Sequence, residues 1–180
     1  MKRLRPLILA AFALTLASCT GVPEGVTPVQ DFRLQPYLGR WYEIARLDHS
    51  FERGLTRVTA DYSLNPDGSV RVINRGYDAR EGEWQQAEGR AVFAGDENSG
   101  HLKVSFFGPF YASYVIIELD SDYRYALVSG YNREYLWILS RSPQLAPETR
   151  ERLVRRAAEL GFPTGQLIFV EQSGAAAGDL

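Results

Sequence analysis

Eight short segments of strand-like sequence follow one another at nearly regular spacing between Gly39 and Arg141, and this succession is the main constraint on the fold. The segments are 39–47, 56–64, 69–77, 84–94, 101–107, 112–119, 123–130 and 135–141. The turn at 65–68 pairs a proline with a glycine that accepts a positive φ angle, and no proline interrupts a segment. Ten Tyr, nine Phe and three Trp also suit strands. The pattern predicts an all-β antiparallel barrel or sandwich.

Two of these segments, 112–119 and 135–141, are apolar on both faces and therefore need cover on both sides. The interior of a barrel covers one face. The spacing of apolar residues predicts one helix, 147–160, that covers the other, with a proline in its first turn and a glycine after its end. The apolar residues 167–170 predict a short ninth strand on the outside of the barrel.

Residues 1–18 have the pattern of a lipoprotein signal peptide: a basic start, an apolar run and the lipobox Leu16-Ala17-Ser18-Cys19. The apolar run is too short to span a bilayer, which needs about 20 residues. We expect cleavage before Cys19 and acylation of its thiol and amino groups, which gives a stable membrane anchor. The alternative is an ordinary signal peptide followed by a free cysteine.

The residue after the cysteine is Thr20 and not aspartate, which indicates export to the outer membrane, with the domain facing the periplasm. Residues 19–30 contain two prolines and two glycines and are predicted to form an acylated, extended tether. With the only cysteine acylated, the folded domain would contain no disulfide. Removal of the basic signal leaves a mildly acidic chain, which argues against nucleic acid as a partner.

The first strand opens with Gly39-Arg40-Trp41-Tyr42 and the last ends at Arg141. These residues resemble the Gly-x-Trp signature and the partner arginine of the lipocalins. Longer stretches are similar to the bacterial outer-membrane branch of that family: 41–46, 51–54, 103–111 and 135–141. The resemblance covers about residues 30–172. One departure is the turn Ser129-Gly130-Tyr131-Asn132-Arg133, where lipocalins often carry Thr-Asp-Tyr.

The resemblance implies an eight-stranded antiparallel up-and-down β-barrel with one C-terminal helix and a short ninth strand, over residues 31–172. Residues 173–180 are expected to be a disordered tail. In the family, the tryptophan closes one end of the barrel and the arginine packs across it. We therefore expect Gly39, Trp41 and Arg141 to form a structural base, and a guanidinium over an indole is a favourable pairing.

The family implies an amphipathic ligand, either a fatty acid or a lysophospholipid, inside the barrel. Parity along the strands, and a position near the open end, give the residues expected to contact it: Trp137, Leu139, Tyr114, Ile116, Phe106, Phe110 and Tyr111. Each aromatic residue among them suits a plain barrel core equally well. His49 and Arg53, in the first loop, would meet a lipid head group or pair instead with acidic residues of the same loop.

Two other kinds of function are weighed against a lipid carrier. A barrel filled by side chains would make the chain a structural or interaction lipoprotein of the envelope. A lipid-modifying enzyme is a weaker alternative, because the chain has no Gly-x-Ser-x-Gly elbow and no phosphate-binding glycine loop. His49 and His101 lack metal-ligand spacing, so no catalytic residue, metal or cofactor is expected. A homodimer is left open.

Overall fold

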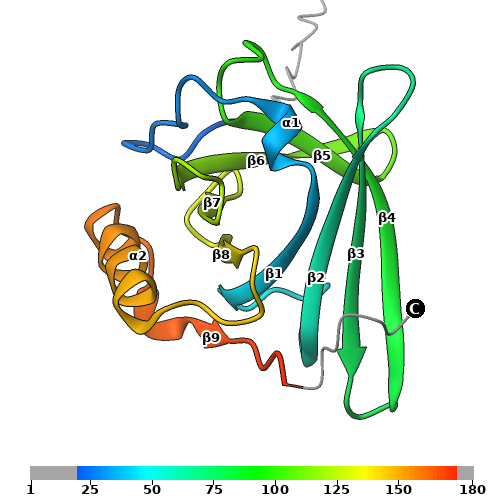
Figure 1. The fold of residues 1–180 in the computed structure, drawn as a ribbon, viewed down its shortest axis with the longest axis vertical. Coiled ribbons are helices and arrows are strands. Elements are labelled where there is room, and N and C mark those ends of the chain that lie inside the picture. The colour runs from blue at the N-terminus through cyan, green and yellow to red at the C-terminus, as the bar shows by residue number, and fades with distance from the viewer. Residues whose placement is uncertain (1–19, 174–180) are drawn as a thin grey trace, which may run out of the picture.

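The computed structural model describes residues 20–173, which form a closed antiparallel β-barrel (Figure 1). Its strands are β1 (Gly39–Arg46), β2 (Leu55–Leu64), β3 (Val70–Asp78), β4 (Glu83–Phe93), β5 (His101–Phe107), β6 (Phe110–Leu119), β7 (Tyr125–Ser129) and β8 (Leu136–Ser140). Each strand pairs with the next along the chain, and β1 pairs with both β2 and β8, which closes the barrel. The predicted eight-stranded barrel is confirmed.

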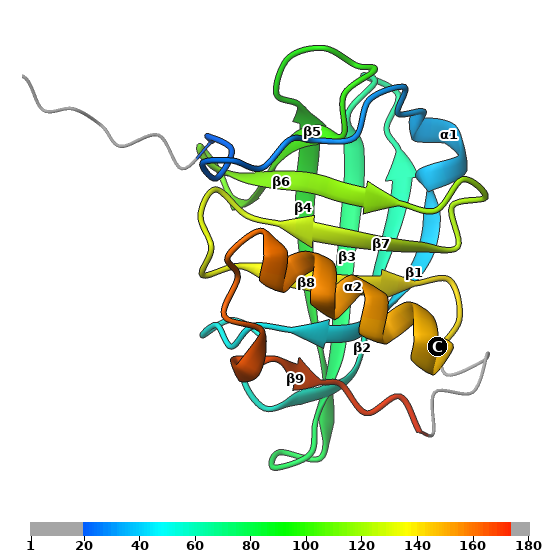
Figure 2. The same cartoon turned by 90° about the vertical axis from the view of Figure 1, so that its left-hand side faces the viewer.

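One helix and a ninth strand lie outside the barrel, as the sequence predicted (Figure 2). The helix α2 (Pro147–Glu159) has a proline at its start. The strand β9 (Ile168–Phe169) pairs with the C-terminal end of β1, at Ala45 and Arg46. Leu153 and Ala157 of α2 are fully buried in a cluster with outward-facing residues of β6, β7 and β8. The helix therefore supplies the second cover that the apolar strands require. Two short elements, α1 (Leu34–Tyr37) and η1 (Thr164–Gln166), were not predicted.

The described part of the segment predicted to be an extended tether lies against the barrel. Val26 is buried beside the helix cluster. The backbone N–H of Val29 donates to the carbonyl of Ile116 at 2.9 Å, and the N–H of Gly100 donates to the carbonyl of Val29 at 2.8 Å. Regularly spaced valines give this segment an apolar side that gains free energy by packing. The predicted signal peptide, Cys19 and, except for Ser173, the predicted tail 173–180 lie outside the described residues.

One end of the barrel is closed by Trp41, which is fully buried. Its indole Nε1 donates a hydrogen bond to the carbonyl of Tyr37 at 2.9 Å. The guanidinium carbon of Arg141 lies 4.0 Å from the centre of the indole ring. The Nη2 atom of Arg141 also donates to the carbonyls of Pro36 and Leu38, at 2.7 and 2.9 Å. The arginine thus ties the chain entering β1 to the strand that ends the barrel.

Gly39 begins β1 at this closed end with a φ angle of +91°, a backbone conformation that residues other than glycine rarely adopt. A Cβ atom at this position would lie 3.4 Å from Nη1 of Arg141. Both the backbone conformation and the close approach of the arginine therefore favour glycine here.

Within residues 20–173, no helix combines the length and the apolar character needed to cross a membrane.

The turn after β6 holds a buried carboxylate whose charge stabilises the fold. Asp120 accepts hydrogen bonds from Nε and Nη2 of Arg124, at 2.7 and 3.0 Å. These bonds are the main cause that lowers the pKa of Asp120 from 3.8 to about 2. A carboxyl with a lowered pKa stabilises the fold above its ordinary pKa, and this contribution is lost as the pH falls toward 2.

We expect Asp120→Asn to reduce the free energy of unfolding at pH 7 by only about 1–2 kcal/mol, because solvent around Arg124 weakens the pair. At pH 2 the loss should be much smaller, because much of the Asp120 carboxyl is then protonated in the wild type as well. Urea unfolding at the two pH values measures the difference. Asp122→Asn, at an exposed site in the same turn, is the control. An equal loss at both pH values would contradict the assigned role of the charge.

Candidate functional site

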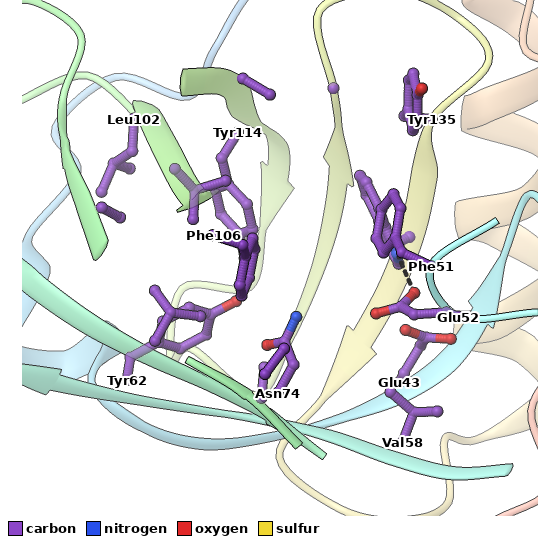
Figure 3. Close-up of a pocket in the computed structure, with 18 of the residues that line it drawn as sticks. Glu43, Phe51, Glu52, Val58, Tyr62, Asn74, Leu102, Phe106, Tyr114 and Tyr135 are labelled. Atoms are coloured by element: carbon purple, nitrogen blue, oxygen red, sulfur yellow. Dashed lines mark hydrogen bonds between the residues drawn. The ribbon is translucent and has the colours of Figure 1, made fainter. Parts of the chain in front are cut away.

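A cavity of about 640 Å³ lies inside the barrel (Figure 3). Its lining is mostly carbon and includes residues of the β1–β2 loop, the β5–β6 hairpin and the β7–β8 loop, which surround the open end of the barrel. The volume falls within the range of about 300–1,000 Å³ that is usual for small-molecule sites. The barrel interior is therefore hollow rather than filled by side chains.

Most residues that the sequence analysis placed at the ligand line this cavity, namely Phe106, Phe110, Tyr111, Tyr114, Trp137 and Leu139. Ile116 does not line it. Its side chain faces the barrel interior but is fully buried in the core cluster that surrounds Trp41. Ile116 lies two residues beyond Tyr114 toward the closed end, where packed side chains already fill the barrel.

The two predicted head-group residues of the β1–β2 loop do not line the cavity either. His49 is buried, stacks on the Phe51 ring at 3.9 Å, and has its Nε2 3.0 Å from Oε2 of Glu52, outside hydrogen-bond geometry. Arg53 is exposed, with its Nη2 2.7 Å from Oδ2 of Asp48. Arg53 thus pairs with an acid of its own loop and His49 lies against another, which is the alternative to contact with a lipid head group.

Three tyrosine hydroxyls meet on the wall of the cavity toward the closed end. The hydroxyl of Tyr114 lies 2.6 Å from that of Tyr37 and 3.0 Å from that of Tyr62. Burial is the main cause that raises the pKa of each tyrosine, so all three stay protonated at neutral pH. Three hydroxyl protons serve two mutual hydrogen bonds, which leaves one proton to donate to a guest or a water molecule.

Two carboxylates reach the cavity from the side nearer the open end (Figure 3). Glu43 projects from β1, and its Oε1 accepts a hydrogen bond from Nη1 of the buried Arg46 at 2.6 Å. Glu52 projects from the β1–β2 loop and accepts a hydrogen bond from the Trp137 indole at 3.2 Å. The Nη2 of Arg46 donates to the carbonyl of Glu52 at 2.7 Å. The wall thus holds two acids against one guanidinium.

The environments of the two acids push their pKa values in opposite directions. Burial and the neighbouring Glu52 carboxylate raise the pKa of Glu43, against the opposing effect of Arg46. Burial acts on Glu52 as well, but His49, Trp137 and Arg46 together outweigh it and lower the pKa of Glu52. Glu52 therefore carries the negative charge of the pair most readily.

The raised pKa of Glu43 gives a testable pH dependence. The folded protein keeps a proton on Glu43 that the unfolded chain releases above its ordinary pKa of 4.5, so stability falls as the pH rises from there. We expect Glu43→Gln to flatten the fall in unfolding free energy as the pH rises above about 5, because glutamine carries no titrating proton. Chemical unfolding across this window measures it.

The control for this prediction is Glu88→Gln, which removes an exposed carboxylate paired with Arg71. The pKa of Glu88 is lowered by this arginine, so its titration lies below the window. A Glu43→Gln protein whose stability falls with pH as steeply as that of the wild type would contradict the buried, protonated state of Glu43.

Several lining residues were not predicted, among them Tyr37, Tyr62, Glu43 and Glu52. Period-two alternation in 56–64 puts Tyr62 on one face with Val58 and Ala60, so the face was readable but its inward direction was not. Glu43 shares inward parity with Trp41, yet an acid in an apolar barrel is unexpected from sequence. Tyr37 precedes the first strand, and no periodic pattern marks it. Within the described residues, no group of His, Cys, Asp or Glu side chains is arranged to hold a metal ion.

The family model for a lipocalin-like domain matches residues 32–172. The outer membrane lipoprotein Blc of Vibrio cholerae is 52% identical over 170 residues, which cover 94% of this chain and 99% of the relative. Blc of Escherichia coli K12 is 51% identical over 175 residues, covering 96% and 99%. Insecticyanin from the tobacco hornworm superposes with a TM-score of 0.69 at 24% identity, over 87% of this chain and 89% of that structure, which shows the shared fold. The outer-membrane localisation expected from the lipobox is confirmed by the two bacterial relatives. The chain belongs to the lipocalin family.

Proposed function

We propose that this lipid-anchored outer-membrane lipocalin binds one fatty acid or lysophospholipid in its barrel, and so stores, carries or scavenges such lipids on the periplasmic side of the envelope. The observation that carries the proposal is the apolar cavity of about 640 Å³ with an open mouth. The main alternative, a structural lipoprotein whose barrel is filled by side chains, would leave no space for such a cavity. Membership in a family of binding proteins also argues against an enzyme.

The size and lining of the cavity suit an acyl chain. Burial of about ten methylene groups contributes roughly 8 kcal/mol, at about 0.8 kcal/mol for each group. Loss of ligand freedom offsets part of this gain and leaves an affinity of the order of micromolar. Leu102, Val104 and Leu139 offer the chain apolar contacts, and the free hydroxyl proton of the tyrosine group gives one polar contact.

The carboxylates near the open end favour one of the two ligand classes. Glu52 lines the cavity and is held in its charged form, whereas Glu43 keeps its proton and the Arg46 guanidinium is not part of the lining. The Glu52 carboxylate repels the carboxylate of a free fatty acid and attracts the ammonium of an ethanolamine or choline head group. Of the two ligands, a zwitterionic lysophospholipid therefore fits the site better.

Titration of the delipidated protein with lysophosphatidylethanolamine and with palmitate, followed by tryptophan fluorescence, tests this function, because Trp137 lines the cavity. We expect saturable binding of both lipids at one site, with the lysophospholipid tighter at pH 7. Glu52→Gln should narrow the difference, since it removes the charge that distinguishes the two head groups. Absence of saturable binding by either lipid would reject the proposal.

A further inference from the structure

Asn74 places a polar side chain in the otherwise apolar inner face of β3. Val72 and Gly76, two positions before and after it, line the cavity on the same face. The Oδ1 atom of Asn74 is buried, and no group within residues 20–173 donates a hydrogen bond to it. A buried oxygen without a donor costs free energy, and buried polar atoms are usually paired. This acceptor is therefore open to a donor that a ligand brings into the cavity.

Tyr62 is a close neighbour of Asn74 in the sheet. Because Tyr62 pairs with Val72 in the register of β2 and β3, Asn74 is its diagonal neighbour, at about 7–8 Å. This spacing is within reach of a long aromatic side chain. Both side chains project into the cavity (Figure 3). A ligand oxygen that enters the space between them meets a hydroxyl group on one side and an amide oxygen on the other.

The hydrogen bonds among the three cavity tyrosines can run in one direction and end at Tyr62. Tyr37 then donates to Tyr114, and Tyr114 donates to Tyr62, across the contacts of 2.6 and 3.0 Å. The proton of Tyr62 is left to donate into the cavity. Hydrogen bonds in such a row polarise one another, which strengthens the last donor. A ligand hydroxyl that accepts from Tyr62 and donates to Oδ1 of Asn74 completes the row.

The apolar lining continues beyond this pair toward the closed end of the barrel. Val70, two residues before Val72, lines the cavity, and so does Ala91, with which Val70 pairs. In the other direction, Tyr114 lies four residues, or about 13 Å, from Phe110 at the mouth. A long acyl chain with its head group at the mouth therefore brings its middle carbons, and not its end, to the tyrosines.

The two polar groups suit a neutral oxygen rather than a charged one. A single free proton does not satisfy a carboxylate, which accepts several hydrogen bonds, and a buried charge without a partner is costly. A plain methylene group leaves both the tyrosine proton and the Asn74 oxygen unpaired. A hydroxyl group accepts once and donates once, so it satisfies both.

We propose that Tyr62 and Asn74 form a specificity subsite for an acyl chain that carries a hydroxyl group near its middle. The proposal rests on the lipid-binding function proposed above and adds the class of chain that the cavity prefers. Each of the two residues contributes one hydrogen bond, so the hydroxylated chain binds about tenfold more tightly than the plain one.

Three lysophosphatidylethanolamines with stearoyl chains test the subsite: one plain, one with a hydroxyl group at the middle of the chain, and one with a hydroxyl group beside the ester. Each competes with a fluorescent lysophospholipid for the delipidated full-length mature protein. We expect the mid-chain hydroxyl to lower the dissociation constant about tenfold, and the hydroxyl beside the ester to change it by less than about twofold. The two hydroxylated lipids are isomers, so the second controls for the general polarity of the chain.

Tyr62→Phe and Asn74→Leu nearly keep the size of each side chain and remove one partner of the ligand hydroxyl. Each should reduce the tenfold preference to about threefold, and the double substitution should abolish it. Asn74→Leu should bind the plain lipid at least as tightly as the wild type does, because it removes an unpaired oxygen. A merely structural role of Asn74 would instead weaken the binding of all three lipids.

The matched control removes a tyrosine hydroxyl from the outside of the same strand. Tyr77 has the opposite parity to Asn74 on β3, and the guanidinium of Arg57 lies 3.8 Å from its ring centre. We expect Tyr77→Phe to keep the full preference for the mid-chain hydroxyl.

Equal, saturable binding of the plain and the mid-chain hydroxylated lipid by the wild type would overturn the subsite and leave lipid binding itself in place. An equal gain for the two hydroxylated isomers would overturn it too, since the position of the hydroxyl would then not matter. So would a preference that survives the double substitution. Absence of binding by all three lipids would reject the lipid-binding function and the subsite with it.

Discussion

Ala112→Trp is expected to weaken lipid binding by at least about a hundredfold. Ala112 lies on β6 and lines the cavity two residues from Tyr114, so an indole at this position projects into the space that an acyl chain needs. Displacement of only four methylene groups costs about 3 kcal/mol, which corresponds to more than a hundredfold in the dissociation constant. Equilibrium titration with a fluorescent lysophospholipid measures the change.

The matched control adds the same indole to the outside of the barrel. Ser63 is exposed on β2, and its parity is opposite to that of the cavity residue Tyr62. We expect Ser63→Trp to leave the affinity unchanged within about twofold. If Ala112→Trp bound lipid as tightly as the wild type while folded, binding would have to occur outside the cavity.

Trp41→Ala is expected to lower the free energy of unfolding by about 3–5 kcal/mol, as is usual when a fully buried aromatic side chain is removed. The substitution opens a void in the closed end of the barrel and removes the surface under the Arg141 guanidinium. It also removes the hydrogen bond to the Tyr37 carbonyl. Urea unfolding followed by far-ultraviolet circular dichroism measures the loss.

Trp84 provides the comparison for this prediction, because it is also a tryptophan under an arginine but lies on the surface. It is 45% exposed, and the guanidinium of Arg57 lies 4.9 Å from its ring. We expect Trp84→Ala to cost less than about 1 kcal/mol, since little burial is lost. Equal losses for the two substitutions would show that the base is not the site that holds the barrel together.

The fold was predictable because its determinants are local. Alternation, turn residues and the double-sided apolar character of 112–119 gave the strands to within two residues of their observed ends and required an outer cover. The helix α2 was recognisable from Pro147 at its start and Gly161 after its end. The short α1 was not, since four residues carry too little periodicity for a pattern.

The candidate site was predictable only in part, because strand parity says which residues face inward and not how deep the cavity runs. Tyr114 and Ile116 share one face of β6, yet the packed closed end begins between them. The buried pairing of Glu43 with Arg46 depends on the bulge in β1 opposite β8, which no local pattern encodes. The docking of residues 20–30 on the barrel likewise depends on long-range contacts, such as that of Val29 with Ile116.

Native mass spectrometry of the protein extracted from its own outer membrane tests the hollow, lipid-binding barrel most directly. We expect the wild type to retain one amphipathic lipid for each chain, in addition to the acyl groups on Cys19, and the Ala112→Trp protein from the same membrane to retain little or none. Equal lipid on the two proteins, or none on the wild type, would contradict binding inside the barrel.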